Sequence, residues 1–387
     1  MVKRNINIIL ILLTIIFIVS SCSGTKEVTS SKKIKFIGEY TFSSDTHFKG
    51  TLLGGLSGLN YDENKNILYA LSDDFGNPKR PPLNTSRIYK FKIDMNSKKF
   101  EVHPEEILFL KKEGKVLPNG FIDPEAISII PSGKMLISSE GKVYKRAADN
   151  LGPALPQILI FDLKGNLQNE ISLPRKFLPK DKSNTYGIRS NSGHEGLTTT
   201  TDGNVLYTMT ENSLGQDYKY PHYLRFSVFK KAGKSYDYSN EYIYEIDEIP
   251  NNLGFEPTVI STGVSEILYV MNNHFLAIER TFVSDQKTNQ RNIIKIYEFW
   301  LNKETTDVSK LTSLDNVKVL KKELLINLDS IIPLLDNKDN RGGTILDNQE
   351  GMTWGPVLNG RKTLILVSDN NFSSIQRTLF LAFSIEI

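Results

Sequence analysis

The sequence of 387 residues predicts an all-β repeat protein, a β-propeller of four-stranded antiparallel blades. The first observation is a short phrase that recurs five times: Glu or Ser, then usually a small residue, then a large aliphatic residue. Its copies are Leu56-Ser-Gly-Leu59, Pro124-Glu-Ala-Ile127, His194-Glu-Gly-Leu197, Val264-Ser-Glu-Ile267 and Gln349-Glu-Gly-Met352. Their first residues lie 68, 70, 70 and 85 positions apart, and such regular self-similarity indicates a repeat architecture.

The second observation is that the apolar segments are short, rich in β-branched and aromatic residues, and bounded by Gly, Asn, Asp and Pro. No long segment has a helical period, and only Ile107–Lys112 and Leu324–Leu335 are candidates for helical turns. The expected strands are Ile67–Ser72, Ile88–Ile93, Met135–Ser139, Ile158–Asp162, Val205–Thr210, Tyr223–Phe229, Ile267–Met271, Phe275–Glu279, Ile293–Leu301, Thr363–Ser368 and Thr378–Ile387.

Every repeat has the same order of elements. A strand starts at the phrase, and a turn such as Asp202-Gly-Asn204 leads to a second strand that closes on an acid. A third strand follows, and then a fourth, more polar strand at Phe100–Val102, Gln168–Leu173, Glu241–Ile246 or Val317–Asn327. The last repeat lacks a fourth strand of its own, so we expect Lys35–Phe42 to supply it and close the ring.

The number of blades follows from the number of phrases. Five phrases predict five blades, but their spacing exceeds the ~40–50 residues of an ordinary blade. Two explanations remain open: long loops take up the excess, or a sixth, degenerate blade lies between residues 267 and 350.

The first 33 residues have the features of an exported lipoprotein. A basic start leads into the apolar run Ile6–Val19, which is too short for a membrane span and ends in Val-Ser-Ser-Cys22. This ending resembles a lipobox, which makes residues 1–21 a signal peptide, Cys22 the lipidated residue, and 22–33 a polar tether to a domain over 34–387. The alternative is a plain signal peptide with an incidental cysteine. Either way the chain is expected at a bacterial cell envelope, periplasmic or on the outer surface.

Composition limits the choice of partners. The chain carries 47 basic and 44 acidic residues, a net charge of +3, which gives no electrostatic case for nucleic acid. Cys22 is the only cysteine, so no intramolecular disulfide supports the fold, and the 39% of hydrophobic residues must supply the core. We expect a monomer that touches the membrane only through the lipid at Cys22 and that acts on a small molecule.

Acidic residues recur with the repeat and predict a charged central channel. Equivalent residues of a propeller form rings around its axis, so Glu125, Glu195 and Glu350 are expected in one ring, with Ser57 and Ser265 in register. A second ring would hold the acids that close the second strands: Asp73, Glu140, Glu211, Glu279 and Asp369. Like charges this close are unfavourable without a positive partner. Two partners remain open: Ca²⁺, which takes 6–8 oxygen ligands, or the arginines Arg87, Arg225, Arg280 and Arg377.

His194 and Ser57 are the other candidates for chemistry. His194 stands beside Glu195 and is either a general acid–base or a hydrogen-bonded histidine at a strand start. Ser57 lies in Gly-Leu-Ser-Gly-Leu59, which lacks the last glycine of a nucleophile elbow and its strand–turn–helix setting. We therefore expect Ser57 to be structural.

The phrases also resemble a known family. Gly54-Gly-Leu-Ser-Gly-Leu59, Asp123-Pro-Glu-Ala-Ile127, Gly193-His-Glu-Gly-Leu197 and Asp347-Asn-Gln-Glu-Gly-Met352 look like the bacterial phytase-like domain described as having esterase-like activity. So do the strand ends Leu71-Ser-Asp-Asp74, Ser138-Ser-Glu-Gly141, Thr210-Glu-Asn212 and Val367-Ser-Asp-Asn370. The resemblance runs from about Lys35 to Ile387 and implies a β-propeller that hydrolyses phosphate or carboxylic esters.

Together these observations predict a lipid-anchored ester hydrolase, acting on phosphate esters with Ca²⁺. The alternative is a non-catalytic propeller that binds a glycan, a small ligand or a protein partner, because this fold hosts many functions. The expected catalytic residues are His194 and Glu195. Substrate binding is assigned to Arg87, Arg225 and Arg377, and metal binding to Glu125, Glu195, Glu350, Glu140, Glu211 and Asp369.

Overall fold

The computed structural model describes residues 33–76, 85–97, 99–141, 155–180, 183–250, 253–336 and 345–387. Within these ranges no helix has the length and apolar character needed to cross a membrane. The predicted signal peptide, Cys22 and nearly all of the predicted tether lie outside them.

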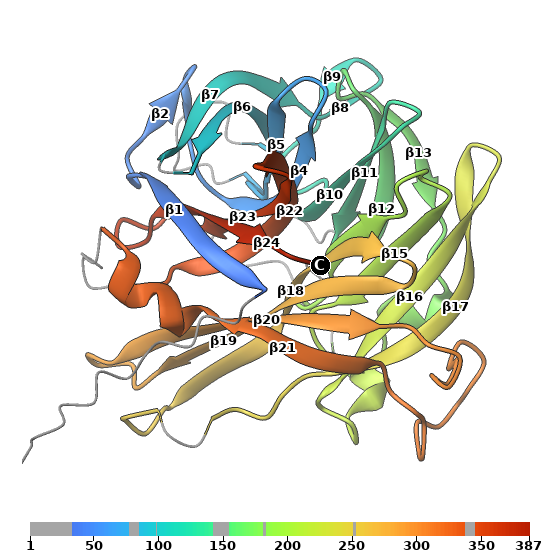
Figure 1. The fold of residues 1–387 in the computed structure, drawn as a ribbon. Helices are drawn as coiled ribbons and strands as arrows, with labels where there is room; N and C mark the ends of the chain where they lie inside the picture. The colour runs from blue at the N-terminus through green and yellow to red at the C-terminus, as the bar shows by residue number, and fades with distance from the viewer. Residues whose placement is uncertain are drawn as a thin grey trace, which may run out of the picture.

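The described chain forms five four-stranded antiparallel sheets, which are the blades of a propeller (Figure 1). Blade 1 comprises β4 (Leu56–Asp62), β5 (Ile67–Ser72), β6 (Arg87–Asn96) and β7 (Lys99–Phe109), and blade 2 comprises β10 (Pro124–Ile130), β11 (Lys134–Ser139), β12 (Gln157–Asp162) and β13 (Leu167–Ile171). Blade 3 comprises β14 (His194–Thr199), β15 (Val205–Thr210), β16 (Tyr223–Ala232) and β17 (Ser235–Glu245), and blade 4 comprises β18 (Val259–Met271), β19 (His274–Ser284), β20 (Gln290–Trp300) and β21 (Lys321–Asn327).

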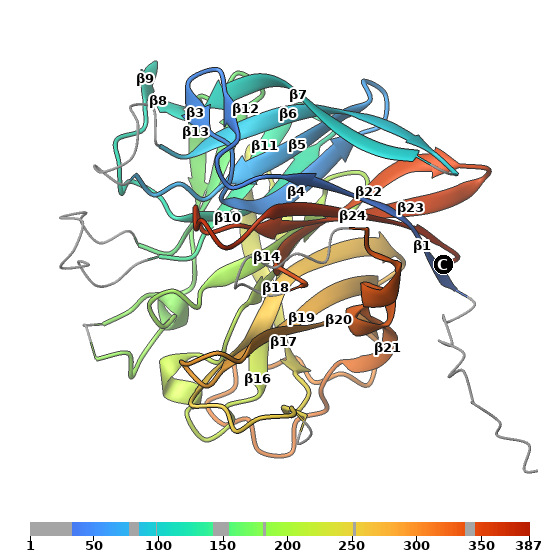
Figure 2. The ribbon, with the colours of Figure 1, turned by 90° about the vertical axis from the view of Figure 1, so that its left-hand side faces the viewer.

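Blade 5 joins the two ends of the described chain. It comprises β22 (Asn348–Leu358), β23 (Arg361–Asp369) and β24 (Thr378–Ile385), and its outer strand is β1 (Ile34–Phe42). β1 runs antiparallel to β24, from the pair Ile34–Ile385 to the pair Phe42–Thr378 (Figure 2). The predicted closure of the ring by the N-terminal strand is therefore confirmed.

The five inner strands β4, β10, β14, β18 and β22 contact one another in turn, and β22 returns to β4. The ring has five blades, and the described residues between 267 and 350 contain no sixth, degenerate blade. The excess length of the fourth repeat goes into the connection of residues 301–320 between β20 and β21, and into the 3₁₀ segment η3 (Leu328–Leu334).

The Gly and Asn residues in the turns explain the hairpins between the first and second strands of each blade. The residue before or near the start of each second strand has a positive φ: Asn66 (52°), Gly133 (72°), Gly203 (67°), Asn273 (62°) and Gly360 (77°). Gly and Asn tolerate this conformation best, and tight hairpins require it. The Gly- and Asn-containing turns that mark each repeat thus fix where the second strand begins.

The hydrophobic core lies between neighbouring blades. At the junction of blades 5 and 1, the ring of Phe91 lies 5.7 Å from that of Phe380 in an edge-on arrangement, and Phe42 of β1 packs against both. Edge-on aromatic pairs contribute roughly 0.5–1.5 kcal/mol beyond the burial of their area. β1 therefore closes the ring through its side chains as well as through its backbone.

Four shorter elements and two further 3₁₀ segments decorate the loops. They are β2 (His47–Phe48), β3 (Thr51–Leu52), β8 (Lys111–Lys112), β9 (Lys115–Val116), η1 (Arg175–Phe177) and η2 (Gly215–Asp217). The prediction of a helical turn at Ile107–Lys112 is wrong, because this stretch continues β7 and enters β8. In Leu324–Leu335 the first part completes β21, and helical turns begin only at Leu328.

Candidate functional site

Each blade carries a β-bulge at the same point of the repeated phrase. The pairing of first and second strands shifts between Leu56 and Gly58 in β4, and at the corresponding place in β10, β14, β18 and β22. A bulge leaves an extra residue unpaired and re-aims its side chain. The bulge contains the second position of the phrase, and from there Glu125, Glu195 and Glu350 line one pocket.

The small third position of the phrase keeps the inner strands close together. A Cβ atom added at Gly58 would lie 2.8 Å from the carbonyl oxygen of Glu125 in the next blade, and one at Gly196 would lie 2.9 Å from the amide nitrogen of Ile267. Such contacts are too short for real side chains, so only a small residue allows this packing. The close approach brings the bulges of adjacent blades to one narrow channel.

Blade 4 departs from this pattern with Glu266 at the third position. The carboxyl of Glu266 accepts hydrogen bonds from the backbone N–H groups of Leu197 (3.1 Å) and Ile267 (2.9 Å). Burial raises the pKa of Glu266 well above its usual range, although these hydrogen bonds lower it. Glu266 therefore links blades 3 and 4 and does not line the pocket.

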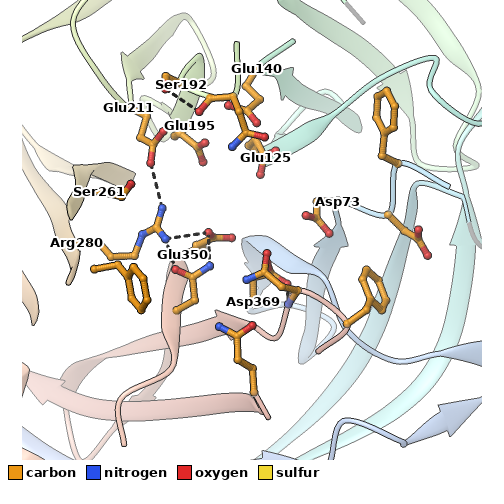
Figure 3. A pocket seen from close by; sticks show the side chains of 18 of the residues that line it. Asp73, Glu125, Glu140, Ser192, Glu195, Glu211, Ser261, Arg280, Glu350 and Asp369 are labelled. Carbon is orange, nitrogen blue, oxygen red and sulfur yellow. Dashed lines mark hydrogen bonds and ion pairs between the residues drawn. The ribbon is translucent and has the colours of Figure 1, made fainter. Parts of the chain in front are cut away.

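Carboxylates dominate the wall of a pocket of about 670 Å³ that opens where the second strands end (Figure 3). They are Asp73, Asp74, Glu125, Glu140, Glu195, Glu211, Glu350 and Asp369. Arg280 is the only cationic side chain among the described lining residues. All six residues that the sequence proposes as metal ligands are on this wall: Glu125, Glu195, Glu350, Glu140, Glu211 and Asp369.

Two trios of buried carboxylates have the spacing of a metal site, and all their members except Asp123 line the pocket. One trio is Asp123, Glu125 and Glu140, and the other is Glu140, Glu195 and Glu211. In each trio one oxygen from every residue lies within 4.8 Å of the others, and Glu140 belongs to both. Hard oxygen donors gathered from several strands suit Ca²⁺. Sequence reasoning missed Asp123 as a ligand, although it stands two residues before Glu125 in the phrase.

Burial and crowding raise the pKa values of these carboxylates. Burial raises the pKa of Glu125 well above its usual range, and the charges of Glu195 and Glu140 raise it further. The pKa of Glu195 is raised by burial first, and then by Glu140 and Glu211. Burial raises the pKa of Glu211 to about 7, although Arg280 opposes this. A bound cation would relieve the repulsion among these carboxylates.

The predicted second ring is correct in four blades and wrong in blade 4. Asp73, Glu140 and Glu211 directly follow β5, β11 and β15, and Asp369 ends β23. In blade 4 the register pairs Gly263 with Arg280, as Asn348 pairs with Asp369 in blade 5. Arg280 therefore takes the place that an acid takes in the other blades.

Glu279 points away from the pocket. Its carboxylate accepts hydrogen bonds from the Tyr244 hydroxyl (2.8 Å) and the backbone N–H of Asp247 (3.2 Å), and it pairs with Lys322. These partners come from the end of blade 3 and from β21. Adjacent residues of a strand face opposite sides of the sheet. A register one position later than the sequence predicts therefore places Arg280 in the pocket wall and turns Glu279 away from it.

Arg87, Arg225 and Arg377 stand at the starts of third strands, as the sequence predicts, but outside the pocket lining. Each side chain is at most 6% exposed. Arg87 pairs with Asp74, Arg225 with Asp217 and Arg377 with Asp347, each at 2.8 Å, and Arg225 also pairs with Glu241 at 2.6 Å. The predicted role of these arginines in substrate binding does not fit this burial. Their ion pairs are with acids outside the two predicted rings, so the alternative that arginine neutralises the ring acids is borne out by Arg280, which pairs with Glu211 and Glu350, and not by these three.

His194 is fully buried and does not line the pocket. Its ring packs against Phe177, with centroids 5.0 Å apart, and neither ring nitrogen has a hydrogen-bond partner in the described chain. Burial lowers the pKa of His194 to about 4. The predicted role as a general acid–base therefore does not fit its position, whereas Glu195 does face the pocket.

The two serines of the phrase are buried as well. Ser57 is 1% exposed and Ser265 2% exposed, and neither lines the pocket. The Ser265 hydroxyl donates to the carbonyl oxygen of Gln349 (3.1 Å). These positions agree with a structural role.

The uncharged side chains of the pocket wall were not predicted from the sequence. It consists of amides, hydroxyls and three aromatic rings: Asn191, Ser192, Asn212, Ser261, Asn292, Asn348, Asn371, Gln376, Phe75, Phe282 and Phe372. Most of these residues lie next to a strand-end acid or in a loop, where no repeated spacing marks them. Asn348 is the exception, because it directly precedes the fifth phrase.

Several proteins of known structure resemble this chain in shape at low sequence identity. A GH43 β-1,3-galactosidase has 10% identity and a TM-score of 0.45; the match covers 89% of this chain and 60% of the galactosidase. A periplasmic gluconolactonase of Pseudomonas aeruginosa has 12% identity and a TM-score of 0.31, with 77% and 97% covered. A gluconolactonase of Xanthomonas campestris has 11% identity and a TM-score of 0.36, with 84% and 71% covered. Likeness at this level says nothing about activity.

Comparison with curated proteins finds no match. Comparison with protein families does: residues 51–372 match the Phytase-like family, described as "Esterase-like activity of phytase". That range includes the pocket carboxylates from Asp73 to Asp369 and the repeated phrases of all five blades. The description is that of a hydrolase. The chain therefore belongs to the Phytase-like family.

Proposed function

We propose that the pocket binds Ca²⁺ and hydrolyses phosphate esters of small molecules. The observation that carries this proposal is the pair of carboxylate trios that share Glu140. Their oxygens come from strands of two blades, so the fold holds them in place before any ion arrives. The family description supports hydrolysis of an ester, and the ligand chemistry supports a hard divalent cation.

The charge of the pocket explains why a phosphate ester would need the cation. Eight acidic side chains and one arginine line the wall, which would repel an anionic substrate. A divalent cation supplies positive charge at the phosphoryl oxygens and lowers the pKa of bound water. The protein's own part is to hold Glu140 between the two trios and to keep Glu195 within the pocket.

Glu195 is the carboxylate that we propose as proton acceptor from the attacking water. It lines the pocket, and its pKa is raised by burial and by Glu140 and Glu211. A base works best when its pKa is near the operating pH, and a raised carboxyl pKa moves in that direction. As part of the same proposal, the domain acts as a monomer at the cell envelope, tethered through Cys22.

The test compares the protein with Glu140→Gln, which removes the shared ligand, and with Glu63→Gln, which changes an exposed acid in a turn. Calcium at about 100 times its dissociation constant stabilises a protein by roughly 2.7 kcal/mol. We expect calcium to raise the melting temperature of the unmodified protein and of Glu63→Gln, but not that of Glu140→Gln. Hydrolysis of a phosphomonoester or phytate should require calcium.

Two results would contradict the proposal. If calcium and chelator leave the melting temperature unchanged, the trios do not hold this ion. If calcium binds and no phosphate or short acyl ester is hydrolysed, the domain is the non-catalytic binding propeller. Glu140→Gln is expected to fold, because it removes one of several mutually repelling carboxylates, and its melting temperature without calcium checks this.

A further inference from the structure

Arg280 is the one residue with a positive charge in the described ring of strand-end side chains, whose other members are acids. The other four blades place Asp73, Glu140, Glu211 and Asp369 at this level, whereas blade 4 places a guanidinium there. Blade 4 also has a serine at the bulge position. Among the described residues it therefore contributes no carboxylate to the pocket, only Ser261, Arg280, Phe282 and Asn292.

The contacts of Arg280 place it at the edge of the second carboxylate trio. Its Nη2 donates to Glu211 Oε1 at 3.0 Å, and its Nη1 lies 3.6 Å from Glu350 Oε1 and donates to the amide oxygen of Asn348 (Figure 3). Glu211 is thus shared between the trio and the guanidinium. The side chain of Arg280 remains 16% exposed, in contrast to the enclosed Arg87, Arg225 and Arg377.

Arg280 remains charged in this setting. Burial lowers its pKa, but the carboxylates of Glu350 and Glu211, and then of Glu195 and Asp369, raise it overall. A guanidinium presents its N–H groups in a planar fork that matches two oxygens of a phosphate. The neighbouring Glu211 and Glu350 hold this fork at the pocket wall.

We propose that Arg280 binds the anionic oxygens of the substrate beside the cation and thereby selects phosphate esters over neutral esters. This inference rests on the proposed function, because it needs a cation in the adjacent trio. A cation that draws the Glu211 carboxylate towards the trio weakens the Glu211–Arg280 pair. The guanidinium is then free to donate to a phosphoryl group that also contacts the cation.

A simple counter-ion role predicts a different response to mutation. Replacing Arg280 by Gln removes the only positive charge on the described wall. Calcium should therefore bind more tightly to this variant whether Arg280 is only a counter-ion or also binds the substrate. Only an arginine that contacts the substrate anion would also lower the affinity for phosphate. The two affinities are therefore expected to change in opposite directions.

The experiment measures calorimetrically the binding of calcium, and then of inorganic phosphate to the calcium-loaded protein. The variants are Arg280→Gln, Arg280→Lys and the control Arg361→Gln, whose side chain is 55% exposed in a surface ion pair. We expect phosphate to bind about tenfold more weakly to Arg280→Gln, since charge-assisted hydrogen bonds are lost. Arg280→Lys keeps the charge and should keep the calcium affinity, while phosphate binding weakens because the planar fork is lost.

The outcomes separate this inference from the proposed function. If the unmodified protein binds no calcium, the proposed function fails, and this inference fails with it. If the unmodified protein binds calcium but not phosphate, or if both Arg280 variants bind phosphate as it does, the inference alone is overturned. Arg361→Gln should match the unmodified protein in both affinities.

Discussion

His194 and Glu195 are adjacent in the sequence but occupy different environments. Glu195 sits in the bulge of β14 and lines the pocket, whereas His194 packs against Phe177 inside the blade. Successive strand residues face opposite sides, so neighbours along the chain need not be neighbours in a site. Because burial lowers the pKa of His194 to about 4, its ring is neutral at pH 7.

The substitution His194→Leu is expected to leave the calcium-induced rise in melting temperature unchanged and not to lower the melting temperature itself. Both ring nitrogens lack hydrogen-bond partners among the described residues, and an unmet buried polar group costs ~1–3 kcal/mol that an apolar side chain of similar size avoids. Scanning calorimetry with and without calcium measures both quantities. A loss of the calcium effect in a folded His194→Leu protein would restore His194 to the site.

The proposed calcium binding is expected to depend on pH through Glu211. Burial raises its pKa to about 7 in the folded protein, above the ordinary value of 4.5 for a glutamate. Between those values the folded state holds a proton that the unfolded chain has lost. This contribution to stability is fully present below about pH 4.5 and is lost as the pH rises through about 7. Calcium needs the carboxylate, so the same proton competes with the ion.

The calcium-induced rise in melting temperature should therefore be larger at pH 8 than at pH 6. Glu125 and Glu195, whose pKa values are also raised, act in the same direction. Thermal unfolding at each pH, with calcium and with chelator, gives the difference directly. Comparing the two at one pH cancels the separate pH dependence of His194. An equal rise at both pH values would show that the ion does not bind these carboxyls.

At the scale of the strand, the sequence predicts the elements better than their register. Every expected strand overlaps an observed one, because the short apolar segments and the Gly and Asn turns determine roughly where strands begin and end. The fourth strands are the least accurate, since Val317–Asn327 begins four residues before β21. The β-bulges are not visible in one strand alone, since a bulge is a mismatch between two strands. The recurring small position, exemplified by Gly58, could have indicated close packing of inner strands.

Blade 4 shows why the ring acids could not all be predicted. In blades 1, 2 and 3 the second strand ends directly before its acid, so the end of the apolar run marks the ring position. β19 continues to Ser284, five residues beyond Glu279, so the end of its apolar run at Ile278 marks Glu279 instead of the ring position. Only the pairing of Arg280 with Gly263 shows which residue faces the channel.

The third-strand arginines illustrate the same limit. The sequence places Arg87, Arg225 and Arg377 correctly and suggests that they neutralise acids. Their partners include Asp74, Asp217 and Asp347, which lie between strands and share no spacing with the arginines. A buried pair of this kind depends on the folded position of both partners, so it could not be predicted from the repeat.

At the scale of the whole molecule, the pocket depends on ring closure. Lining residues come from all five blades, and the ring is completed only where β1 pairs with β24 (Figure 2). No disulfide holds this junction, because the single cysteine is Cys22. Backbone pairing along β1 and the packing of Phe42 against Phe91 and Phe380 hold the ring together.

Removing β1 should therefore open the ring and weaken the pocket as well. A chain lacking residues 1–32 keeps β1 and is expected to unfold at the same urea concentration as the full chain. A chain lacking residues 1–42 exposes the edge of β24 and should be much less stable, aggregate more readily and bind calcium more weakly. The milder change Phe42→Ala, which keeps the backbone pairing, should cost about 3 kcal/mol in urea unfolding. If the chain lacking residues 1–42 matched the chain lacking residues 1–32 in stability and calcium affinity, β1 would not be what closes the ring.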